Sequence, residues 1–138
     1  MPFDGGSSLR FQVLDVLEKS RRYLADRNHW VKGAERSDDM VCILGAVKLY
    51  AEDYPEADRP RIVDRAMDTV GRVIASLYGI RSHAKRKGMN STSRVTSFND
   101  TREIPHCQVV IALDNAIENV IQQSDMIVAE VIPDAEVV

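Results

Sequence analysis

Apolar residues recur at a helical spacing of three and four along most of this chain, which predicts an all-α fold. The clearest segment is residues 38–54, where Lys48 is the only charged residue over residues 40–51. A helix that is apolar nearly all round belongs in the middle of a bundle rather than on its surface. Gly45 costs roughly 1 kcal/mol relative to alanine in a helix interior, so we expect a neighbouring backbone to pass close to it.

Three further amphipathic helices are predicted on either side of this central helix. The first covers residues 7–26, with its charged residues mostly on the face opposite the apolar stripe. The second starts at Pro60, which suits a first helical turn, and ends near Gly79 or continues raggedly to Gly88. The third covers residues 104–123. We therefore expect residues 1–138 to form one domain, a bundle of four main helices.

The segments between these helices are polar or irregular. Residues 1–6 are expected to be disordered, and residues 80–97, rich in Arg, Lys, Ser, Thr, Asn and Gly, are expected to form an exposed basic loop. Residues 30–37 form a connector that contains Trp30, the single tryptophan of the chain. We expect its ring to plug one end of the bundle rather than to stack on a ligand. Asp38 or Asp39 is the expected N-terminal cap of the central helix.

The C-terminal segment, residues 126–138, combines apolar and acidic residues. Residues 126–132 are mostly β-branched or otherwise apolar and precede Pro133, which predicts a short strand or a short extended tail. At ~0.8 kcal/mol per buried CH₂ group, exposure of this stretch would forfeit several kcal/mol. We expect it to be buried, either on its own bundle or between two copies in a symmetric dimer, and we favour the homodimer.

Length and composition indicate one globular domain in a reducing compartment. The chain has 138 residues, of which 44% are hydrophobic, so it can bury a core without disulfides. Cys42 and Cys107 both lie in apolar helical patterns and are expected to be small buried residues. The N-terminal residues lack the pattern of a signal peptide, and no apolar stretch approaches the ~20 residues that span a bilayer. We expect a cytoplasmic protein with no membrane contact.

Charge is distributed unevenly behind a net value of −3. Residues 69–102 carry 7 Lys/Arg and 1 Asp/Glu, whereas residues 103–138 carry no Lys/Arg and 7 Asp/Glu. The candidate charged partner surface consists of Arg81, His83, Lys85, Arg86, Lys87 and Arg94. Such asymmetry suits attraction within one molecule, between two copies, or toward a charged partner. Nucleic acid is one such partner, although the acidic net charge and the absence of aromatic residues beside these cations weaken that interpretation.

Familiar catalytic and metal-binding signatures are absent from the sequence. It has no Gly-rich phosphate loop, no G-x-S-x-G elbow, no H-E-x-x-H helix and no C-x-x-C pair. His29, His83 and His106 lie far apart, so no two of them have the i, i+3 or i, i+4 spacing that directs two rings at one metal. We expect no metal and no cofactor, and we favour a function other than catalysis.

One group of polar residues is nevertheless expected to meet at an end of the bundle. If the helices over residues 38–54 and 104–123 begin at the same end, their free N–H groups and nearby polar side chains would surround one rim pocket. Its candidate residues are Trp30, Asp39, Cys42, Asn99, Asp100 and His106. In an enzyme, Cys42 would be the nucleophile and Asp100 or His106 the base. We favour helix capping and turn formation, because both account for Asp39, Asn99 and Asp100 without any ligand.

Four short motifs lie at these same positions: Trp30-x-x-Gly33-Ala34, Cys42-x-x-Gly45-Ala46, Phe98-Asn99-Asp100 and Leu113-Asp114-x-Ala116-Ile117. With them the chain resembles a family of small uncharacterised bacterial and phage proteins, in which an aromatic-Asn-Asp turn precedes the last helix. The resemblance covers roughly residues 9–121. It implies a shared architecture and a common rim around Trp30, Asn99 and Asp100, and it brings no activity with it.

The sequence therefore predicts a protein-interaction module with a protein partner of unknown identity. If the phage association of the resemblance applies, the module would be a regulator or a counter-defence factor. A nucleic-acid-binding protein that uses the basic residues 81–94 is the first alternative. A small hydrolase or transferase that uses the rim pocket is the second.

Overall fold

The computed structural model describes residues 5–78, 90–101 and 103–131, and the side chains of residues 9–78, 90–101 and 103–123. The α-helices are α1 (Gly5–Leu24), α2 (Ile43–Ala51), α3 (Arg59–Tyr78), α5 (Ser91–Asp100) and α6 (His106–Val131). Two short strands, β1 (Arg36–Ser37) and β2 (Met40–Val41), and two 3₁₀ turns, η1 (Arg27–His29) and η2 (Glu56–Asp58), lie between them. The predicted all-α fold class is confirmed.

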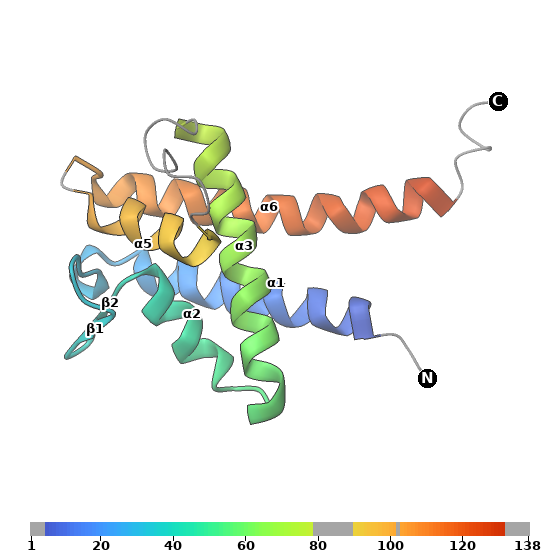
Figure 1. Cartoon of the computed structure of the whole chain (residues 1–138), viewed down its shortest axis with the longest axis horizontal. Coiled ribbons are helices and arrows are strands. Elements are labelled where there is room, and N and C mark those ends of the chain that lie inside the picture. Colours follow the sequence, from blue (N-terminus) through green and yellow to red (C-terminus); the bar gives the residue numbers. More distant parts are fainter. Residues whose placement is uncertain (1–4, 79–89, 102, 132–138) are drawn as a thin grey trace.

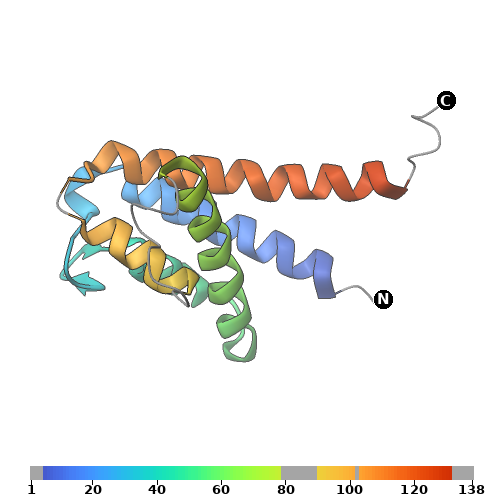
Figure 2. The same ribbon diagram turned by 45° about the horizontal axis from the view of Figure 1, so that its top comes forward.

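The long helices α1 and α6 run antiparallel and pack against each other, and α3 crosses both of them (Figure 1). Helix α5 packs on α3, and α2 lies against α1 and α3. The N-terminal half of α1 and the C-terminal half of α6 project on the same side of the molecule, where the two helices diverge (Figure 2). The small β1–β2 hairpin lies at the opposite end. The molecule therefore has a closed end with the hairpin and an open end with two projecting helices.

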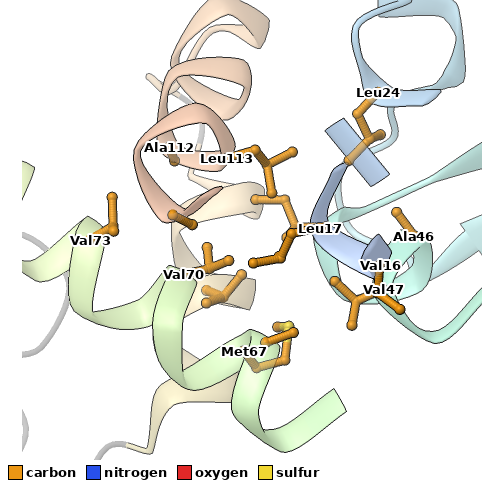
Figure 3. Close-up of a cluster of buried hydrophobic side chains, with 14 of the residues drawn as sticks. Val16, Leu17, Leu24, Ala46, Val47, Met67, Val70, Val73, Ala112 and Leu113 are labelled. Carbon is orange, nitrogen blue, oxygen red and sulfur yellow. The ribbon is translucent and has the colours of Figure 1, made fainter. Parts of the chain in front are cut away.

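One hydrophobic core joins these helices. Figure 3 shows side chains from α1, α2, α3 and α6 that meet in it, and Val95 and Phe98 bring α5 into the same cluster. The labelled residues are fully or almost fully buried: Val16, Leu17, Leu24, Ala46, Val47, Met67, Val70, Val73, Ala112 and Leu113. Helix α2 contributes five buried residues out of nine, in keeping with its nearly uninterrupted apolar sequence.

Gly45 has the close backbone neighbour that its sequence position predicts. A Cβ atom at this residue would lie 2.1 Å from the carbonyl oxygen of Glu35, which is far inside van der Waals contact. The same oxygen accepts a hydrogen bond from the backbone N–H of Cys42 at 3.1 Å. The connector therefore passes directly over the first turn of α2, and only glycine leaves room for it.

The central helix is shorter than predicted, because its first residues form the hairpin. Strands β1 and β2 are antiparallel, with Arg36 opposite Val41, and Asp38 and Asp39 make the two-residue turn between them. Asp38 has φ +56°, a left-handed conformation that aspartate tolerates better than most residues because its short side chain can hydrogen-bond locally. The predicted aspartate cap is therefore wrong.

Cys42 caps α2 instead. Its Sγ atom accepts a hydrogen bond from the backbone N–H of Gly45 at 3.3 Å. The predicted helix from residue 38 thus starts at Ile43 and ends at Ala51.

Part of the predicted basic loop is helical. Helix α5 covers residues 91–100, and the Asn90 side chain caps it by accepting a hydrogen bond from the Ser93 N–H at 2.7 Å. Two apolar residues three positions apart, Val95 and Phe98, give a periodic signal too short to recognise in a polar sequence. Residues 80–89 of that loop lie outside the described residues.

Both ends of the chain are more helical than predicted. Helix α1 already begins at Gly5, within the segment expected to be disordered. Helix α6 continues to Val131, so the predicted strand over residues 126–132 is wrong as far as residue 131. Any extended tail begins no earlier than residue 132, outside the described residues. The β-branched residues of this segment do not prevent a helix, since their helix propensity is only slightly unfavourable.

We expect Gly45→Ala to lower the free energy of unfolding by at least about 2 kcal/mol. The added methyl group meets a backbone carbonyl that cannot move without breaking the hairpin, and overpacking of this kind costs typically 1–3 kcal/mol or more. Gly71→Ala is the matched control, because its Cβ would come only as near as 3.1 Å to the Ser91 Cβ and 3.3 Å to the Ser91 backbone, against a gain of roughly 1 kcal/mol of helix propensity. Urea denaturation of both variants measures the difference. Equal stability of the two would contradict the close approach at Gly45.

Candidate functional site

The residues predicted for the rim pocket lie mostly together at the closed end of the molecule. There the N-terminal ends of α2 and α6 and the C-terminal end of α5 meet beside the hairpin (Figure 1). Trp30, Asn99 and Asp100 are joined through hydrogen bonds, and the ring of His106 lies 5.7 Å from that of Trp30, measured between centroids. We call the residues joined to the side chains of Asn99 and Asp100 the Asn99 cluster: Trp30, Val31, Gly33, Ile43, Asn99 and Asp100.

Asn99 is fully buried at the centre of this cluster. Its Oδ1 accepts hydrogen bonds from the indole N–H of Trp30 at 2.8 Å and from the backbone N–H of Ile43 at 3.2 Å. Its Nδ2 donates to the carbonyl oxygen of Val31 and to Oδ1 of Asp100, both at 3.0 Å. A side-chain amide offers two acceptor lone pairs and two donors. All four are used within the protein, so Asn99 has none left for a ligand.

The other polar groups around Asn99 are held by the backbone. Asp100 Oδ1 also accepts a hydrogen bond from the N–H of Gly33 at 2.9 Å, and Gly33 has φ +80°, which glycine adopts without strain. The Lys32 ammonium group donates to the carbonyl oxygens of Thr101 and Ile104, the latter at 2.8 Å. It also lies 5.2 Å from the centroid of a Trp30 ring, within cation–π range. These contacts fasten the connector to the C-terminal end of α5.

His106 ties the first residue of α6 to the last residue of α1. Its Nε2–H donates a hydrogen bond to the carbonyl oxygen of Leu24 at 2.5 Å. The last carbonyl groups of a helix have no partner within the helix, so this imidazole satisfies one of them. The Nε2 proton is therefore engaged in a contact between helices.

Cys42 is a buried thiol rather than an activated one. Its side chain is 3% exposed, and burial raises the pKa of the thiol although the N–H groups of Gly45 and Leu44 act in the opposite direction. The negative charges of Asp100 and Glu35 raise it further. Cys42 lines a cavity of about 180 Å³ together with these two carboxylates. At neutral pH the sulfur is protonated, and a protonated thiol is a weak nucleophile.

Cys107 was predicted to be buried, but it is exposed. It lies in the first turn of α6, two residues before Val109, the first buried position of that helix. The apolar pattern there begins at residue 109. Burial was therefore the wrong prediction for Cys107 and the right one for Cys42.

Two further predicted site residues lie apart from the Asn99 cluster. Asp39 is exposed on the hairpin turn, where its backbone carbonyl accepts a hydrogen bond from the Tyr23 hydroxyl. Arg94 is half-buried on α5 and donates from Nη1 to the Gly71 carbonyl at 3.4 Å. Its Nε is buried with no hydrogen-bond partner among the described residues. The remaining residues of the predicted charged surface lie outside the described residues: Arg81, His83, Lys85, Arg86 and Lys87.

A second polar hollow was not predicted from the sequence. The rings of Tyr23 and His29 stack with centroids 4.0 Å apart, and Tyr50 meets Tyr23 edge-on at 6.2 Å. These residues line a pocket of about 340 Å³ with Lys19, Arg22 and Asp53. The lining residues come from α1, η1, α2 and the turn after α2. Their spacing in the sequence gives no sign that they meet.

The charged groups of this hollow largely neutralise each other. Lys19 forms ion pairs with Asp15 at 3.1 Å and with Asp53 at 3.0 Å. His29 donates from Nδ1 to the Tyr23 carbonyl at 2.9 Å. Burial raises the pKa of Tyr50, and Tyr23 and Asp53 add to the effect. The tyrosine is therefore neutral at physiological pH, and its phenolate is not available as a base.

Within the part of the chain that the structure describes, no group of three or more His, Cys, Asp and Glu residues is placed to hold a metal ion. None of the described helices is long and apolar enough to cross a lipid bilayer.

The model of a family of unknown function, DUF6197, matches residues 10–119. The chain belongs to the DUF6197 family. The matched segment runs from the first turns of α1 into α6 and contains the whole Asn99 cluster, and it nearly coincides with the residues 9–121 that carry the predicted resemblance. A comparison with curated proteins and one with solved structures each found no match. The DUF6197 assignment thus covers residues 10–119 and adds no activity.

We expect Asn99→Ala to lower the free energy of unfolding by about 2–4 kcal/mol. It leaves the Ile43 N–H, the Trp30 indole N–H and the Val31 carbonyl without their partner, and each unsatisfied buried group costs roughly 1–3 kcal/mol. Trp30 is the single tryptophan, so its fluorescence in the folded variant is expected to shift to the red. Asp114→Ala is the control, because it breaks an exposed ion pair with Arg21 and should cost less than about 1 kcal/mol. Similar losses in both variants would contradict the role of Asn99.

The two cysteines are expected to react at very different rates with iodoacetamide in the folded protein. Cys107 is exposed and should be labelled quickly, whereas Cys42 is buried with a raised pKa and should react only after denaturant is added. Mass spectrometry of the labelled Cys107→Ser variant isolates the Cys42 rate. Rapid labelling of Cys42 in that folded variant would show an accessible thiolate and would support Cys42 as an enzymatic nucleophile.

Proposed function

We propose that this DUF6197 protein is a protein-interaction module that binds its partner through the projecting parts of α1 and α6. We call these parts the helical arm and define it by its backbone, residues 5–14 of α1 and residues 117–131 of α6. Of its described side chains, Phe11 and Ile121 are exposed, whereas Val13 and Val120 belong to the core. The proposal places recognition at the open end of the molecule, away from the Asn99 cluster. The two free cysteines of the described chain favour a reducing, cytoplasmic setting.

The hydrogen bonding, burial and protonation of the polar residues support a binding function over a catalytic one. Asn99 uses all its hydrogen-bonding groups internally, Lys32 is engaged with backbone carbonyls, and Cys42 is a buried, protonated thiol. Catalysis needs a reactive group that is accessible and correctly ionised. The described part of the rim provides capping and cross-linking between segments instead.

The helical arm carries exposed apolar side chains on both of its helices. Phe11 of α1 is 71% exposed and Ile121 of α6 is 39% exposed. Exposed large apolar side chains are the usual contact residues of a protein interface. A partner that covers the arm would remove both side chains from water.

The finer cellular role rests on the family resemblance alone: we propose a regulator or a phage-related counter-defence factor. Stoichiometric binding suits either role and agrees with the module described above. The alternatives receive less support from the described residues. Arg94 is directed to the Gly71 carbonyl rather than presented as a phosphate contact, and the candidate nucleophile Cys42 is buried.

A pull-down from the native cell with matched α6 variants tests the proposal. Ile121 lies in the helical arm and Ile111 lies outside it on the same helix, and their exposures are 39% and 40%. We expect wild type and Ile111→Glu to recover a protein in stoichiometric amounts, and Ile121→Glu to recover at least about tenfold less, a loss of about 1.4 kcal/mol. Equal recovery by the two variants, or no stoichiometric protein with wild type, would contradict the proposal.

A further inference from the structure

We draw no further inference here: the strongest candidate, the polar hollow beside α1, η1 and α2 that is lined by Tyr23, His29 and Tyr50, carries nothing, because Lys19 there pairs with Asp15 and Asp53 and no described group selects one class of ligand for it.

Discussion

The side-chain amide of Asn99 joins three parts of the chain that are far apart in sequence: the connector at Trp30 and Val31, the first turn of α2 at Ile43, and the end of α5. Buried polar groups are tolerated only when they are satisfied, and here every hydrogen-bonding group of the amide is. The β1–β2 hairpin, the start of α2 and the end of α5 can therefore adopt only the arrangement that meets all four bonds together. The close approach of Glu35 to Gly45 depends on the same arrangement.

This constraint divides the molecule into two ends with different physical characters. At the closed end, the polar residues that resemble an active site in the sequence bind one another and the backbone. At the open end, α1 and α6 diverge (Figure 2), and they carry the exposed apolar residues Phe11 and Ile121. Two other contacts, of Arg21 with Asp114 and of His106 with the Leu24 carbonyl oxygen, join the two long helices to each other.

Much of the fold could be predicted from apolar periodicity, since α1, α3 and most of α6 carry long stripes with an ordinary helical period. The close neighbour of Gly45 could also be predicted. Glycine is unfavourable in a helix interior, so its presence there indicates that a neighbouring backbone comes too close for a larger residue. The hairpin at Asp38 and Asp39 could not, because its strands have two residues each and show no alternation. Helix α5 and the exposure of Cys107 were missed because short segments give too few apolar positions. The membership of Asn99 in a buried network depends on tertiary contacts across more than fifty residues, which no local pattern contains.

Amide hydrogen exchange of the full chain tests the central claim most directly, because it reports on the Ile43 amide that donates to Asn99. The account predicts that this amide is strongly protected in the wild type and exchanges much faster in a folded Asn99→Ala chain. Fast exchange at Ile43 in the wild type, or equally slow exchange in the two chains, would contradict a closed end held together by Asn99.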